Sequence, residues 1–198
     1  MRVLGSAVSW FLFALCFTLL YLSSTIVLGL GGFCASGGPY VIAVECPDSV
    51  VAFTPLSIFG GLIAVGIGVF LAQGFGTPLV TWAWPILFCG LGIGFLTEFF
   101  GTGDPTGLII GVMFEIMGIV PLIIEFRGSV QRVFLGQFTV RGIQFYEGDR
   151  ARRSMLSPQT PNPEDAVPPT LGNWAASLLI LVVAGGAGIE LGRAAFGF

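Results

Sequence analysis

Long apolar stretches, separated by short polar segments, dominate the hydrophobic pattern of the chain. Because the apolar core of a bilayer is about 30 Å thick, a helix needs roughly 20 apolar residues to cross it. Five stretches approach or exceed that length, at residues 7–30, 56–73, 79–100, 107–126 and 174–195. The first is too long for the apolar part of a signal peptide, so we expect it to remain as a span. The pattern predicts an all-α transmembrane helical bundle of five spans.

The arginines predict how these spans are oriented. Arg2 precedes the first span, six arginines lie in residues 127–173, and Arg193 is the only other one. With the N-terminus in the cytoplasm, seven of the eight arginines lie inside, as the positive-inside rule requires. We therefore expect a cytoplasmic N-terminus and a C-terminus on the outside.

The polar segments predict three regions. These are a four-helix core at 1–126, a cytoplasmic segment and tether at 127–173, and a fifth transmembrane helix at 174–198. The core includes an outer loop, at 31–55, that holds Cys34 and Cys46. Two cysteines in an oxidising compartment favour a disulfide that staples the loop, and a redox-active pair is the alternative.

The cytoplasmic segment has two parts of different composition. Aromatic residues at helical spacing between positions 134 and 145 predict an interfacial amphipathic helix, and two intervening glycines leave a strand open. We expect this basic part either to lie against anionic lipid headgroups or to bind a soluble partner protein. Five prolines between residues 157 and 170 predict an extended tether before the fifth span.

The outer loop and the second span resemble a known group of proteins. The residues that carry the resemblance are CASGGPY from Cys34 to Tyr40, the pair Cys46-Pro47, and SIFGG from Ser57. They look like uncharacterised actinobacterial multi-pass integral membrane proteins, over roughly the first half of the chain. The resemblance implies a bacterial plasma membrane and brings no activity with it. The chain has no lysine, whose codons are A-rich, and this also indicates a GC-rich bacterial genome.

Small residues form a continuous face on the second span. They repeat every four positions, at Gly60, Ala64, Gly68 and Ala72. Such a face is typical of close helix packing in lipid, against another span or another subunit. Gly90 and Gly94 form a similar face on the third span.

Three acidic residues inside the spans are candidate functional groups, Glu98, Glu115 and Glu190. Each follows a glycine by four residues, so we expect each carboxylate on the small, packing face of its helix. Arg193 follows Glu190 by three residues and can pair with it across one turn. Glu98 and Glu190 are most simply interfacial. Glu115 lies deepest, and we leave open a structural hydrogen bond, a role in proton or cation passage, and contact with a partner subunit.

Composition excludes several classes of protein. Hydrophobic residues make up 55% of the chain and charged residues 10%, whereas soluble domains carry about 25% charged residues. The net charge of -3 gives no reason to expect a nucleic-acid partner. Histidine is absent, which removes the commonest general base and metal ligand. We therefore expect no enzyme activity, no metal and no cofactor.

These observations predict a non-catalytic membrane protein that acts as an accessory, scaffold or assembly subunit through helix packing. Its partners would be the lipid bilayer and either further copies of itself or a larger membrane complex. The alternative is a small proton- or cation-coupled channel or carrier that uses the intramembrane carboxylates. Five spans give no even inverted repeat, which favours the first interpretation.

Overall fold

The chain is seen as a computed structural model that describes residues 2–32, 34–35, 44–72, 75–126, 134–135 and 170–197. Within these ranges, five helices are long and apolar enough to cross a membrane. They are α1 (Arg2–Gly29), α2 with its π-helical end η1 (Asp48–Ile67, Gly68–Ala72), α3 (Leu79–Thr102), α4 (Pro105–Phe126) and the composite helix α6–η4–α7 (Leu171–Ile180, Leu181–Gly185, Gly186–Ala195). The expected all-α bundle of five spans is confirmed.

The second span begins at Asp48 and not at residue 56. Asp48 places a carboxylate in the first turn, where the positive end of the helix dipole favours it. Pro55 lies inside the helix, and proline is tolerated in membrane helices where neighbouring groups satisfy the freed backbone. The predicted outer loop, 31–55, is therefore wrong at its end, because the helix takes up its last eight residues.

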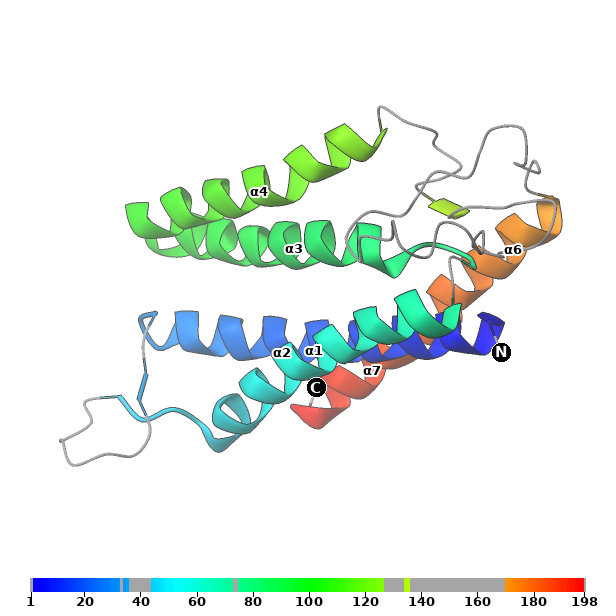
Figure 1. The fold of residues 1–198 in the computed structure, drawn as a ribbon. Coiled ribbons are helices and arrows are strands. Elements are labelled where there is room, and N and C mark those ends of the chain that lie inside the picture. The colour runs from blue at the N-terminus through cyan, green and yellow to red at the C-terminus, as the bar shows by residue number, and fades with distance from the viewer. Residues whose placement is uncertain are drawn as a thin grey trace.

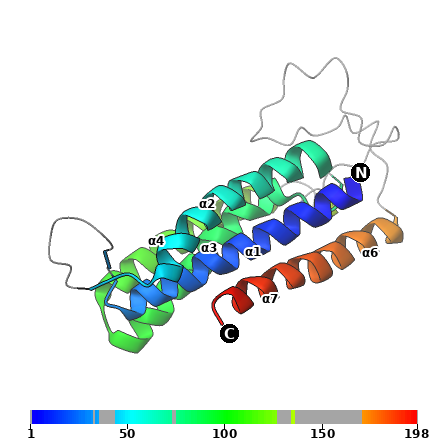
Figure 2. The ribbon, with the colours of Figure 1, turned by 90° about the horizontal axis from the view of Figure 1, so that it is seen from below.

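α1 is the central helix of the bundle. α2, α3 and the fifth span all pack on it, whereas α4 packs substantially on α3 alone among the described helices. Figure 1 shows α3 and α4 as one layer above α1, α2 and α7, and Figure 2 shows α2 and α7 on opposite sides of α1. We call α1, α2–η1 and α6–η4–α7 the α1 group, and α3 with α4 the α3–α4 hairpin.

The fifth span packs on α1 through two buried glycines. A Cβ atom added at Gly188 would meet the carbonyl oxygen of Phe11 and lie 2.9 Å from the backbone nitrogen of Leu15. At Gly192 it would lie 2.8 Å from the Cβ atom of Thr18. Only glycine lets two helix backbones approach this closely. The fifth span therefore packs on the first helix of the same chain.

The small face of α2–η1 also packs on α1. A Cβ atom added at Gly60 would meet the Sγ atom of Cys16, and one at Gly68 would lie 3.4 Å from the Oγ atom of Ser9. Ala64 and Ala72 are both buried. The face predicted to meet another span or another subunit is therefore occupied by α1.

A π-helical turn helps to keep that face aligned. Residues four apart in an α-helix differ in direction by about 40°, so a four-residue repeat drifts around the helix. The last four-residue step, from Gly68 to Ala72, falls in η1, whose wider i→i+5 turn offsets part of the drift.

The hydrophobic core lies around the N-terminal half of α1, where Trp10 and Phe13 pack with Ala64, Leu79 and Ile180. The ring of Phe134 lies beside this end of the bundle, with its centroid 5.3 Å from that of Trp82 and 6.5 Å from that of Trp174. The predicted amphipathic helix beyond Leu135, and the tether up to residue 169, lie outside the described residues. Which end of the bundle faces the cytoplasm stays a prediction from the arginines.

Candidate functional site

The turn between α3 and α4 holds these two helices side by side. Gly103 ends α3 with a φ of 76°, a left-handed conformation that favours glycine, and donates its N–H to the carbonyl of Phe99. The Oδ1 atom of Asp104 accepts a hydrogen bond from the backbone N–H of Thr106, 2.9 Å away, in the first turn of α4. This short capped turn makes the two helices antiparallel neighbours.

Glycines bring the backbones of the α3–α4 hairpin into close contact. A Cβ atom added at Gly92 would lie 3.1 Å from the carbonyl oxygen of Gly111, and one at Gly107 would lie 3.0 Å from the carbonyl oxygen of Phe95. One at Gly118 would lie 3.0 Å from the backbone nitrogen of Cys89. The interface has no space for added side chains along its length.

Glu115 lies at the edge of this interface. A Cβ atom added at Gly92 would lie 2.9 Å from the Oε1 atom of Glu115, so the glycine makes room for the carboxyl group. Oε1 is buried and has no hydrogen-bond partner among the described residues. The Cys89 thiol lies beside the carboxyl group and interacts with it. The site is a single intramembrane carboxyl group between two glycine-packed helices.

A second polar contact joins the two helices further along. Pro121 lies inside α4 and has no backbone N–H, so the carbonyl of Met117 loses its partner within the helix. The indole Nε1 of Trp84 on α3 donates a hydrogen bond to this carbonyl, at 3.0 Å. This hydrogen bond was not predicted from the sequence. The signal that could have revealed it is the proline four residues after Met117, which marks the carbonyl in need of a donor.

Glu98, Gly90 and Gly94 do not join Glu115 in one site. Gly90 faces the ring of Phe17, and a Cβ atom added at Gly94 would lie 3.5 Å from the ring of Tyr21, so both glycines face α1. Glu98 is half-buried near the end of α3, whereas Glu115 lies in the middle of α4.

Glu190 lies on an exposed face, not on the packing face that the sequence predicts. Its side chain is 73% exposed and forms an ion pair with the 54% exposed Arg193, with 3.5 Å between Oε1 and Nη1. The helix buries Gly188 and Gly192 instead. The expectation that Glu190 shares the packing face is therefore wrong, and its pairing with Arg193 is seen.

The three carboxylates do not line one path through the described part of the chain. Glu115 is on α4, which packs on α3, and Glu190 is on α7, which packs on α1. Glu98 is on α3, six residues beyond Gly92, which is the α3 residue that faces the carboxyl group of Glu115. Only Glu115 is left as a candidate site within the bundle.

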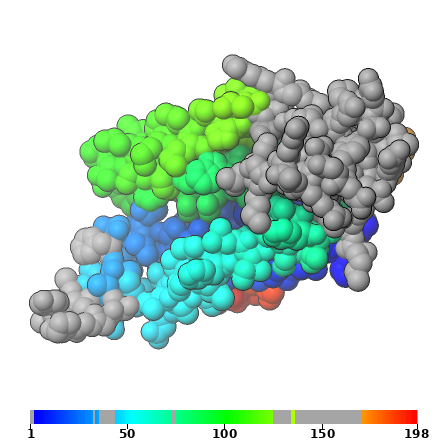
Figure 3. Space-filling view, viewed as in Figure 1, coloured from blue at the N-terminus to red at the C-terminus, as the bar shows by residue number. Residues whose placement is uncertain are grey.

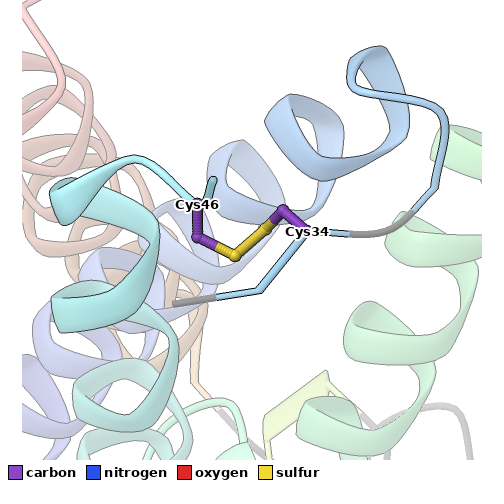
Figure 4. The surroundings of a disulfide bond; sticks show 2 residues. All are labelled: Cys34 and Cys46. Carbon is purple, nitrogen blue, oxygen red and sulfur yellow. A yellow bond between two sulfur atoms is a disulfide. The ribbon is translucent and has the colours of Figure 1, made fainter. Parts of the chain in front are cut away.

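The disulfide expected in the outer loop is present. Cys34 and Cys46 are bonded, with 5.0 Å between their Cα atoms, and Figure 4 shows the bond between the segments that follow α1 and precede α2. The backbone supports it, since Cys46 donates its N–H to the carbonyl of Ala35 at 3.1 Å. The bond closes the connection between two helices that already pack together.

No group of three or more His, Cys, Asp or Glu side chains that could hold a metal ion occurs in the described ranges. Comparison of the chain with family models, with curated proteins and with solved structures gives no match. The resemblance to actinobacterial membrane proteins and the expected lack of enzyme activity stay predictions. Sequence and structure together show five helices, within the described ranges, that are long and apolar enough to cross a membrane, and a disulfide between Cys34 and Cys46.

Proposed function

We propose that the protein is a non-catalytic accessory or assembly subunit of a larger complex in a bacterial plasma membrane. We further propose that it meets its partner through the exposed face of α4 beside Glu115. One observation carries the proposal. The Oε1 atom of Glu115 is buried without a hydrogen-bond partner among the described residues, on the helix with the fewest neighbours in the bundle.

An unpaired polar atom at this depth favours a protein partner over lipid. Lipid tails donate no hydrogen bonds, and a buried polar group without a partner costs about 1–3 kcal/mol. The terminal torsion of a glutamate is broad, so rotation about it can turn a carboxyl oxygen of Glu115 away from Gly92. A transmembrane helix of another protein, with a hydrogen-bond donor at this depth, would complete the site. A second copy of α4 would offer another carboxyl group, which donates a hydrogen bond only while it is protonated.

The surface beside Glu115 is apolar and slightly hollowed. Glu115 lies between two sides of α4. One side carries Gly111 and faces α3, and the other carries Val112 and is exposed. The hollow is lined by Leu108, Ile109, Val112, Met113, Ile116 and Met117. Figure 3 shows α4 along the upper margin of the molecule, separated from α2. A partner helix can therefore contact α4 without displacing the α1 group.

A second candidate function rests on the same carboxyl group. In a proton- or cation-coupled carrier, Glu115 would hold the ion within the membrane. Because Glu98 and Glu190 lie elsewhere, this candidate depends on Glu115 alone.

Purification from the native membrane in mild detergent, followed by native mass spectrometry, tests the proposal. We expect a second protein in fixed stoichiometry with the full-length chain. Ile116→Trp should remove it, because the larger ring fills the hollow beside Glu115. The matched control is Ile63→Trp on α2, since the two isoleucines are 57% and 61% exposed. Loss of the second protein from both variants, or retention in both, would contradict docking on α4.

Substitutions of Glu115 separate the two candidates. Glu115→Gln keeps an oxygen that accepts a hydrogen bond but cannot bind or release a proton, so the complex should survive. Glu115→Leu removes the acceptor and should weaken the complex. The carrier candidate instead requires ion flux in proteoliposomes that Glu115→Gln abolishes and Glu98→Gln preserves. A homo-oligomer with such flux would overturn the assembly proposal in favour of the carrier.

A further inference from the structure

The α3–α4 hairpin is connected to the rest of the chain at one of its two ends. α3 begins at Leu79 and α4 ends at Phe126, and because the two helices are antiparallel, both positions lie at the same end of the bundle (Figure 1). We call this the joined end. The opposite end, at the Gly103 turn, links α3 only to α4, and we call it the turn end.

Contacts between the hairpin and the rest of the bundle are specific at the joined end. The indole of Trp10 on α1 donates a hydrogen bond to the carbonyl of Thr77, just before α3, at 2.9 Å. Leu79 is buried in the core beside Trp10. The rings of Trp82 and Phe134 lie with their centroids 5.3 Å apart. Hydrogen bonding and burial therefore fix the first turn of α3 against the α1 group.

Toward the turn end, such contacts stay inside the hairpin. Trp84 bonds to the carbonyl of Met117, and the ring centroids of Phe95 and Phe114 are 5.6 Å apart. Within the described ranges, no hydrogen bond, ion pair or ring contact joins α4, or the part of α3 beyond Trp82, to the α1 group. The hairpin is thus fixed to the α1 group mainly at one end.

Beyond the joined end, α3 meets α1 through side chains. Gly90 faces the ring of Phe17, and a Cβ atom added at Gly94 would lie 3.5 Å from the ring of Tyr21. Inside the hairpin, by contrast, glycines contact the backbone of the neighbouring helix. A ring can turn aside on its own side chain, whereas backbone atoms move only with their helix. The interface between α3 and α1 is therefore easier to open than the interface between α3 and α4.

We propose that the α3–α4 hairpin moves as one rigid unit, which swings about its joined end and separates from α1 at its turn end. A hinge needs a few terminal or loop residues that absorb a change in backbone angles, and Gly76, with a φ of 73°, lies in the turn before α3. α3 has 24 residues and is about 36 Å long, so a rotation of about 10° moves the turn end by about 6 Å. This motion opens the surface between Phe17 and Gly90 and leaves the interface between α3 and α4 closed.

Distances between pairs of spin labels, measured by electron paramagnetic resonance in nanodiscs, test the motion in the full-length protein. The free cysteines Cys16 and Cys89 are replaced by alanine, and the disulfide is kept, so that labels attach only to introduced cysteines. All four labelled positions are exposed. The pairs are Val51→Cys with Phe100→Cys at the turn end, and Leu4→Cys with Ile124→Cys at the joined end.

The two label pairs should differ in the width of their distance distributions. At the turn end we expect two populations, or one broad population, that extends about 6 Å beyond the shorter distance. At the joined end we expect one narrow population. A narrow population of the same width at both ends would overturn the proposal, because the hairpin would then be fixed along its whole length.

Phe17→Ala sharpens the test, since it removes the ring that Gly90 contacts. We expect the ratio of open to closed populations at the turn end to rise about tenfold, with the joined-end distance unchanged. The matched control is Phe59→Ala on α2, a phenylalanine that is 66% exposed, and it should leave the ratio unchanged. An equal shift in both variants, or none in Phe17→Ala, would contradict an opening between α1 and α3.

Discussion

The α1 group and the α3–α4 hairpin both pack through glycines, but they differ in the polar groups that they bury and in the hydrogen bonds of these groups. In the α1 group, hydroxyls such as those of Thr18, Ser24 and Ser57 bond to carbonyls of their own helices. In the hairpin, Trp84 bonds to a carbonyl on the neighbouring helix, and the Oε1 atom of Glu115 has no partner in the described residues. The α1 group contains the unpaired hydroxyls of Ser23 and Ser177, whereas the hairpin contains the one buried unpaired carboxyl oxygen among the described residues.

This difference separates two roles that helix packing can have in a membrane protein. α1 is covered by α2, α3 and the fifth span, so its contacts hold the chain together. α4 is covered by α3 and leaves an apolar face and a carboxyl group at the margin. We therefore expect changes in the α1 group to unfold the protein and changes on α4 to affect assembly first.

The largest expected effect comes from Gly188→Leu in the α1 group. The added side chain would meet backbone atoms of Phe11 and Leu15, which cannot rotate away, so we expect a loss of about 3 kcal/mol in stability. Thermal melting of the detergent-solubilised protein measures the loss. Gly186→Leu is the control, because nothing lies within 4 Å of a Cβ atom added there. Equal destabilisation by both variants would mean that the fifth span does not pack as described.

A smaller effect is expected for Gly111→Leu in the hairpin. The added side chain would meet the side chain of Leu96, 2.8 Å from the new Cβ atom, which can rotate away, and the backbone nitrogen of Leu96 at 3.1 Å, so we expect a loss of about 2 kcal/mol. The shift of α4 should also remove the proposed partner, as seen by native mass spectrometry. Loss of the partner by Gly188→Leu but not by Gly111→Leu would reverse the roles assigned to the two regions.

The smallest effect is the coupling between Trp84 and Pro121 within the hairpin. Trp84→Phe removes the hydrogen bond to the carbonyl of Met117 and should cost about 1 kcal/mol. In the Pro121→Ala background the alanine N–H can satisfy that carbonyl, so the same change should cost less. A double-mutant cycle of unfolding free energies measures the difference. Additive effects would show that the indole does not compensate for the proline.

The sequence predicts well the features that depend on neighbouring residues. Apolar length predicts the five spans, and Gly103 with Asp104 predicts the tight turn between α3 and α4. The pair Cys34 and Cys46 predicts the observed disulfide. The prediction from the sequence is wrong at the start of α2. The predicted loop ends at Pro55, whereas the helix begins at Asp48 and continues through this proline.

The tertiary structure decided which side of each helix is buried and which other helix that side contacts. Small residues lie on several sides of α7, so helical periodicity alone placed Glu190 on the packing face, while the fold buries Gly188 and Gly192. A π-helical turn at η4 widens the spacing between buried positions of the fifth span to five residues, from Ile180 to Gly185. Which helix each small face meets depends on packing between distant segments, and a local repeat carries no information about that. The sequence by itself determined that these helices are long and apolar enough to cross a membrane, and only the fold placed α1 at their centre and Glu115 at their edge.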